Sequence, residues 1–191
     1  MEKERVILGI DPGTNILGYS IIEQKGKETS LLKMDVIVLG TKDELSTKMK
    51  MLFDKITEII DIFKPDILAI EAPFFGKNVQ SMLKLGRAQG ICIAAAFSRS
   101  IPFVEYSPRK IKQSITGNGA ASKEQVANML QRIFKLEAIP SYLDATDALA
   151  VAVCHSYQKE DLLVSNSSVK KPSSKKSSWA SFVSQNPDRI K

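Results

Sequence analysis

The first 40 residues carry three apolar stretches separated by turn signals. Residues 6–10 form a continuous apolar run, and the turn-forming residues 11–15 follow it. Two further stretches, 16–23 and 30–39, are joined by a Gly/Lys turn at 24–27. Strands connected by turns this short usually pair antiparallel. The pattern therefore predicts that the chain begins with a three-stranded antiparallel meander.

From Glu44 the apolar period changes to that of a helix. One helical face collects Leu45, Met49, Leu52, Ile56, Ile59, Ile60 and Phe63, and Pro65 ends the helix. Beyond it, predicted strands at 67–71 and 102–106 alternate with predicted helices at 79–99, 109–116, 122–136 and 141–157. Ser107 followed by Pro108, and Ser122 followed by Gln125, are typical of helix starts. The order predicts an α/β domain with a five-stranded mixed sheet, an antiparallel meander plus parallel strands, flanked by helices.

The composition changes at residue 159. Residues 165–178 are rich in Ser and Lys and contain almost no large apolar residue, so they are predicted to be disordered. Trp179, Phe182 and Val183 interrupt this polar tail, and a docking motif or a weakly ordered end would explain them, the second being favoured. The sequence thus predicts a folded domain over residues 1–158 and a C-terminal tail over residues 159–191.

The composition is that of a globular cytosolic protein. The chain has 191 residues, 43% of them hydrophobic, and no apolar run long enough to span a bilayer. The N-terminus lacks a signal-peptide layout, and the two cysteines are interpreted as reduced core thiols. A cytoplasmic location without membrane association is therefore expected. The net charge is +6, with +4 of it from residue 159 onward, and this balance is compatible with nucleic acid without being specific for it.

Four carboxylates stand where ordinary surface residues are not expected. Asp11 and Glu71 each end a buried apolar run, and Asp144 and Asp147 lie three residues apart at the start of an apolar helix. Carboxylates that lie close together in a poorly solvated site repel one another, and a bound cation would neutralise this repulsion. Oxygen donors favour Mg²⁺ or Mn²⁺, and two such ions about 3.5–4 Å apart can promote an in-line phosphoryl transfer.

Each carboxylate also has an ordinary explanation. Asp144 could be an acid favoured by a helix dipole, and Asp11 could belong to an Asx turn before Pro12. Glu71 at the end of an apolar strand is harder to explain this way. Taken together, the four acids favour one shared site over four separate structural roles.

The chain resembles the RuvC-type Holliday junction endonucleases, which have an RNase H-like fold. The resemblance rests on residues 7–14 with 18–19, 69–71, 77–78, 83–90, 110–113, 117–119 with Lys123, Gln125 and Val126, and 144–150. These segments occur in the family's order at about its spacing, and they cover residues 5 to 156. Together they are highly specific, although no one of them is specific alone.

The resemblance implies an activity and a set of site residues. Asp11, Glu71, Asp144 and Asp147 match the family's catalytic, metal-binding acids, expected to hold two Mg²⁺ ions, with Mn²⁺ able to substitute. Phe74 matches an aromatic residue that stacks on bases at the junction centre. The implied reaction is symmetric nicking of two opposed strands of a four-way junction, leaving a 5′-phosphate and a 3′-hydroxyl, in homologous recombination and DNA repair. The implied partners are a second copy of the chain in a homodimer and the branch-migration proteins RuvA and RuvB.

Basic residues near these acids in the sequence are candidate DNA contacts. Lys112 and Lys123 match basic residues of the family that face DNA near the scissile phosphate, and Lys77 lies beside Phe74 in the loop after residue 71. Phosphate contacts of this kind would position DNA without reading its sequence. Scattered surface lysines are often inert, so Lys112 and Lys123 carry most of this interpretation. His155, the only histidine, could be a catalytic base, but a partly buried structural residue is the favoured interpretation.

The helix predicted at residues 79–97 is a candidate dimer interface. It has an apolar face with Gly86, Gly90 and several alanines, and such small residues allow helices to approach closely. Packing within one chain would explain the same pattern.

Three other functions compete with junction cleavage. An actin-like or sugar-kinase ATPase would explain the loop at residues 10–14, but the chain lacks the second copy of the domain that would enclose a nucleotide. A junction-binding protein without activity is disfavoured because all four acids are present. Another RNase H-like nuclease is the most serious alternative, because the acids do not define the substrate.

Overall fold

The structure is a computed structural model, and it describes residues 4–40, 43–73 and 78–158. The elements alternate as the sequence predicts. They are β1 (Glu4–Asp11), β2 (Ile16–Lys25), β3 (Glu28–Val38), α1 (Leu45–Phe63), β4 (Ile67–Glu71), α2 (Val79–Phe97), β5 (Phe103–Tyr106), α3 (Pro108–Thr116), α4 (Lys123–Phe134) and α5 (Leu143–Ser156).

The five strands form one mixed sheet in the order β3-β2-β1-β4-β5. β1, β2 and β3 pair antiparallel, while β4 lies parallel to β1 and β5 parallel to β4. The predicted five-stranded mixed sheet flanked by helices is therefore confirmed. Because β1, β4 and β5 run the same way, their carboxyl ends meet at one edge of the sheet.

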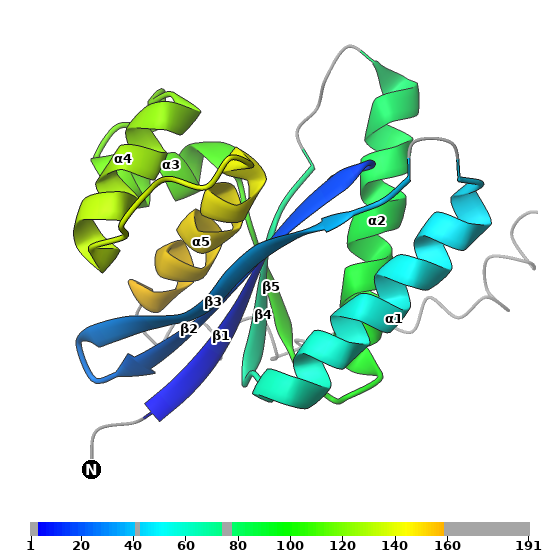
Figure 1. Cartoon of the computed structure of the whole chain (residues 1–191), viewed down its shortest axis with the longest axis horizontal. Coiled ribbons are helices and arrows are strands. Elements are labelled where there is room, and N and C mark those ends of the chain that lie inside the picture. The colour runs from blue at the N-terminus through cyan, green and yellow to red at the C-terminus, as the bar shows by residue number, and fades with distance from the viewer. Residues whose placement is uncertain (1–3, 41–42, 74–77, 159–191) are drawn as a thin grey trace, which may run out of the picture. The chain divides into compact units, whose positions relative to one another are not determined.

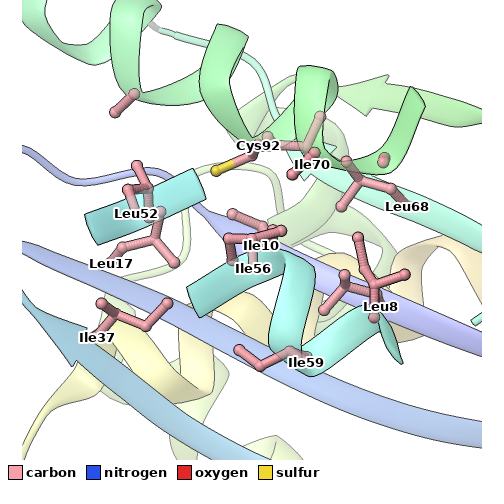
Figure 2. Close-up of a cluster of buried hydrophobic side chains, with 14 of the residues drawn as sticks. Leu8, Ile10, Leu17, Ile37, Leu52, Ile56, Ile59, Leu68, Ile70 and Cys92 are labelled. Atoms are coloured by element: carbon pink, nitrogen blue, oxygen red, sulfur yellow. The ribbon is translucent and has the colours of Figure 1, made fainter. Parts of the chain in front are cut away.

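Helices cover both faces of the sheet (Figure 1). α1 and α2 cover one face, over an apolar cluster that includes Leu8, Ile10, Leu52, Ile56 and Ile70 (Figure 2). α3, α4 and α5 lie on the other face, over a second cluster built around α5. Most residues of α5 are buried, which explains why this helix reads as a nearly continuous apolar run.

The helix starts follow the predicted capping residues. The side chain of Ser107 accepts a hydrogen bond from the Lys110 amide, with Pro108 in the first turn. Ser122 and Gln125 form a complete capping box on α4. Among the residues of the predicted helical face, Leu45 is 41% exposed, because it begins α1 beside an open cavity that it lines with Asn15 and Lys48.

Both cysteines are buried and neither forms a disulfide bond, as predicted. His155 is fully buried rather than partly buried, and its Nδ1 shares a 2.8 Å hydrogen bond with the Tyr106 hydroxyl. Burial, reinforced by Arg5 and Lys110, lowers the pKa of His155 to about 4, so this residue is neutral near pH 7. These contacts support its structural role. Among the helices that the structure describes, none is long and apolar enough to cross a membrane.

Candidate active site

Asp11 and Glu71 are placed by the register of the two central parallel strands. Ile10 of β1 is aligned with Ile70 of β4, so the next residue of each strand is an acid at the same edge. Open α/β sheets bind ligands at the carboxyl ends of their strands. The strand pairing thus brings two of the four predicted acids together.

Helix α5 brings the other two acids to this edge. Asp144 is in its first turn and Asp147 lies one turn later, so both project from the same side of the helix. The helix can approach β2 closely because Gly18, the cross-strand partner of Asp11, has no side chain. A Cβ atom at Gly18 would lie 1.8 Å from the carbonyl oxygen of Asp144.

Two more contacts hold α5 on the sheet. A Cβ atom at Gly9 of β1 would lie 2.4 Å from the carbonyl oxygen of Ala148. The hydroxyl of Ser20 on β2 donates a 3.0 Å hydrogen bond to the same oxygen. These small residues let the backbone of α5 lie directly on β1 and β2, and this fixes where its acids point.

The acids perturb one another strongly. Burial, followed by repulsion from Glu71, Asp147 and Asp144, raises the pKa of Asp11 to about 8. Burial and the charge of Asp147 raise the pKa of Glu71 to about 7. The pKa of Asp147 is also raised, chiefly by burial. Carboxyl groups that resist ionisation in this way provide strong electrostatic stabilisation for a cation.

Two lysines oppose this negative charge. The ammonium group of Lys123 on α4 forms an ion pair and hydrogen bond with the Asp147 carboxylate. Lys112 on α3 is near enough to lower the pKa values of Glu71 and Asp147. Both lysines that the resemblance assigns to DNA therefore lie beside the acids, and Lys123 supplies their closest positive charge.

A small cavity of about 60 Å³ lies between these groups. Its lining includes three of the acids and both lysines, in the set Asp11, Glu71, Pro108, Ile111, Lys112, Lys123, Val126, Asp147 and Ala150. Asp144 is not part of this lining, although its charge acts on Asp11. The structure thus brings Asp11, Glu71 and Asp147 together, with Asp144 at their margin.

The donors fit a hard divalent cation in their chemistry. They are carboxylate oxygens only, partly buried and electrostatically unsatisfied, which is the environment that Mg²⁺ or Mn²⁺ favours. Across residues 4–40, 43–73 and 78–158, no three His, Cys, Asp or Glu side chains are close enough together to hold an ion as they stand. Lys123 acts as the counter-ion in this arrangement. Metal binding would therefore compete with the ion pair between Lys123 and Asp147.

The remaining predicted site residues cannot be compared in the same way. Phe74 and Lys77 lie outside the described residues. The flanking segment is described up to Pro73, and Asn78 caps α2 by accepting a hydrogen bond from the Ser81 amide.

Several residues that shape the site were not assigned a role from the sequence. Gly9, Gly18 and Ser20 seat α5, and Pro108 lines the cavity. A signal for the first group was present, since small residues interrupt otherwise large apolar strands at the positions where another backbone approaches. No sequence signal indicates the ion pair between Lys123 and Asp147, because a separation of 24 residues along the chain does not predict whether two side chains are in contact.

The comparisons with known proteins agree on one family. A family model described as "Crossover junction endodeoxyribonuclease RuvC" matches residues 7–155. A protein of that name from Cytophaga hutchinsonii is 53% identical over 188 residues, covering 98% of this chain and 89% of the relative. Another of that name, from Porphyromonas gingivalis, is 51% identical over 191 residues, covering 99% and 98%.

Solved structures give the same answer. The Thermus thermophilus RuvC structure with a Holliday junction substrate has 32% identity and a TM-score of 0.75, covering 80% of this chain and 93% of that one. The yeast mitochondrial Holliday junction resolvase Ydc2, at 15% identity and a TM-score of 0.60, shares the fold. The family model's match over residues 7–155 covers nearly all of the strands and helices and the positions of all four acids. The chain therefore belongs to the RuvC family of crossover junction endodeoxyribonucleases.

Proposed function

We propose that this protein is a structure-specific endonuclease that resolves Holliday junctions by nicking two opposed strands symmetrically. The observation that carries this proposal is the gathering of Asp11, Glu71 and Asp147, with Asp144 beside them, at one edge of the sheet. The family match covers every one of these positions. The activity serves homologous recombination and DNA repair, and the protein acts in the cytoplasm. The nuclease domain comprises residues 1–158, and residues 159–191 form a separate tail.

The four acids are the catalytic, metal-binding residues. Asp11, Glu71, Asp144 and Asp147 would hold two Mg²⁺ ions, and Mn²⁺ would substitute because it takes the same oxygen donors. Bound divalent ions of this kind activate water and stabilise the attacking and leaving oxygens of an in-line displacement. The reaction leaves a 5′-phosphate and a 3′-hydroxyl.

The protein side chains have separable tasks in this reaction. Asp11 and Glu71, fixed on rigid adjacent strands, set the position of the cation site. Lys112 and Lys123 limit repulsion among the acids and bind the phosphates of the DNA strand that enters the site. When Lys123 leaves Asp147 for a phosphate, it frees a carboxylate for cation binding. Phe74 stacks on bases at the junction centre, and Lys77 contacts the DNA backbone next to it.

The substrate is a four-way junction, which has approximate twofold symmetry. A homodimer with one acid cluster in each subunit matches that symmetry, and it places each cluster at one of two equivalent phosphodiesters. The Thermus relative was solved with a Holliday junction substrate, which supports this choice. The protein acts together with the branch-migration proteins RuvA and RuvB.

The outer face of α2 supports the homodimer. Val79 and Leu83 are 62% and 51% exposed, and a Cβ atom at Gly86 or Gly90 would meet no atom of the described residues within 4 Å. The buried face of the same helix is made instead by Ala88, Gln89, Cys92, Ala95 and Ala96. Packing against the described part of the chain therefore does not account for Gly86 and Gly90, whereas close approach of a second helix would.

Replacing Leu83 with glutamate should convert the dimer to monomers. A charge buried in an apolar interface without a partner is costly, so we expect the dimer to be weakened on the order of 100-fold. Sedimentation of the two proteins over a range of concentrations measures this. Ile62→Glu on α1 is the matched control, because Ile62 is also exposed, at 63%, on a different helix. Equal dimer affinity in L83E and I62E would exclude α2 as the interface.

The activity is tested with a labelled immobile four-way junction in Mg²⁺, beside linear duplex DNA and an RNA–DNA hybrid. Paired symmetric nicks confined to the junction are the expected result. Cleavage of the hybrid instead would assign the protein to another class of RNase H-like nuclease. Tight junction binding without nicks would mean a binding protein and would contradict the assigned activity.

A further inference from the structure

The glycine-containing turn at residues 117–119 borders a large cavity next to the acids. This cavity has a volume of about 690 Å³, within the range of pockets that bind small molecules and nucleotides. Its lining is Glu71, Pro108, Arg109, Lys112, Asn118, Gly119, Ala120 and Lys123. Four of these residues, Glu71, Pro108, Lys112 and Lys123, also line the small cavity between the acids. The two cavities therefore adjoin each other along common walls.

The turn that forms one wall is fixed by its own hydrogen bonds. Gly117 ends α3 in a left-handed conformation, with its amide donating to the Gln113 carbonyl. The Asn118 amide donates to the Thr116 hydroxyl at 3.1 Å, and the Asn118 side chain accepts from the Ala120 amide at 2.9 Å. The wall is thus built before any ligand arrives, which limits the entropy lost on binding.

Gly119 lies against the stem of Arg109. A Cβ atom at Gly119 would lie 2.7 Å from the Arg109 Cγ, 3.3 Å from its Nε and 3.2 Å from its carbonyl oxygen. A side chain at residue 119 would therefore force the arginine out of its present position. The glycine is explained by this contact, because its Cβ position is filled by Arg109.

The cavity is rich in positive charge, and Arg109 carries the positive charge that remains for a ligand. Its lining contains three cations and one carboxylate, Glu71. Lys123 is paired with Asp147, and the charge of Lys112 lowers the pKa values of Glu71 and Asp147. Arg109 forms no ion pair with any carboxylate in the described ranges. An anion entering this cavity would therefore meet an uncompensated guanidinium group.

We propose that this cavity binds the nucleotide next to the scissile phosphate, with Arg109 holding its phosphate and Gly119 holding Arg109 in place. The inference rests on the proposed nuclease function and adds a binding site to it. Pro108 and Ala120 provide apolar walls for the sugar or base, and the guanidinium matches phosphate geometry through two parallel hydrogen bonds. Arg109 is a positioning residue here, since it would set the register of the strand and does not line the small cavity between the acids.

Arg109→Ala should weaken DNA binding without slowing the chemical step. We expect junction affinity, measured in EDTA so that no cleavage occurs, to fall on the order of tenfold, and the salt dependence of log Kd to lose about one unit of slope. In Mg²⁺, KM should rise while kcat stays close to that of the wild type. Arg132→Ala on the last turn of α4 removes the same charge away from the cavity, and it is the matched control.

A double-mutant cycle tests the role of Gly119. Gly119→Ala should weaken binding about as much as R109A does, because it displaces the arginine. In the R109A background, where the stem is gone, the same change should have little further effect. Full additivity of the two losses would show that Gly119 acts independently of Arg109, and it would overturn this part of the proposal.

The outcomes separate this inference from the nuclease proposal. Junction nicking by the wild-type protein tests only the proposed nuclease function. The cavity is judged by the difference between R109A and R132A on whichever DNA the wild type binds, the junction or a short oligothymidylate. Equal affinities and equal salt slopes for the two variants would overturn the cavity assignment, whatever the wild type cleaves. A fall in kcat with unchanged KM would also contradict it, since a positioning contact predicts the reverse.

Discussion

Replacing Asp11 with asparagine should abolish strand cleavage and, in the absence of divalent metal, make the folded protein more stable. The loss of activity follows from removing the acid whose pKa the other three acids all raise, and we expect it to be on the order of 10³-fold or more. The gain in stability follows because Asp11 is a buried charge repelled by Glu71, Asp147 and Asp144. An amide of the same shape removes that repulsion, which we expect to be worth about 1–3 kcal/mol at pH 8.

The pH dependence of this gain has a definite sign. The pKa of Asp11 is raised from its ordinary value of 3.8 to about 8 in the folded protein. Between these values the folded protein retains a proton that the unfolded chain has released. The stability associated with Asp11 is therefore complete below about pH 4 and is lost as the pH rises towards 8. The difference in stability between D11N and the wild type should accordingly be small at pH 5 and largest at pH 8 and above.

Thermal unfolding in EDTA at pH 5 and at pH 8 measures this effect, and the junction assay measures activity. Asp54→Asn is the matched control, because Asp54 is exposed on α1 and its ion pair with Lys50 lies at the surface. That variant should change little in either measurement. Mg²⁺ should raise the melting temperature of the wild type at pH 8 but not that of D11N. A melting temperature for D11N below that of the wild type at pH 8 would mean that Asp11 has a stabilising partner.

The placement of Asp11 and Glu71 could be predicted because it depends on local pattern and one topological rule. Each acid ends an apolar strand, and parallel neighbours end at the same edge of a sheet. The i, i+3 spacing of Asp144 and Asp147 likewise predicts a common helical side. These inferences need the type of each element, which the apolar periodicity supplies, and a parallel pairing of the two strands, which the alternation of strands and helices favours.

The contacts between distant elements could not be predicted in this way. The resemblance implies a DNA-facing role for Lys123, but it does not predict that the ammonium group is paired with Asp147. That pairing depends on how α4 packs beside α5, and no local pattern encodes it. The position of Arg109 is a similar case, since the turn at residues 117–119 predicts a break in the helix but not what fills the space beside Gly119.

Gly18→Ala should destabilise the protein and misplace the active site, although Gly18 carries no functional group. Its added Cβ atom would lie 1.8 Å from the Asp144 carbonyl oxygen and 2.4 Å from the carbonyl carbon. Both are backbone atoms of α5, so no side chain can rotate to make room, and the helix must move away from β2. We expect a loss of about 2–4 kcal/mol in unfolding free energy. A displacement near 1 Å at Asp144 and Asp147 should lower kcat on the order of 100-fold.

Thr47→Ala is the control, because Thr47 is an exposed residue of α1 that lies outside the proposed dimer face of α2. Thr47→Ala should leave stability unchanged or raise it by up to about 1 kcal/mol, since alanine favours the helix. Cleavage by G18A is measured well below its melting temperature, with the folded fraction confirmed by circular dichroism, so that misplacement is separated from unfolding. Wild-type kcat in fully folded G18A would show that Asp144 and Asp147 do not depend on this contact. A reduced kcat with unchanged junction affinity would instead place the effect in the geometry of the acids, because Gly18 lies between Asp11 on the neighbouring strand and the turn of α5 that carries Asp144.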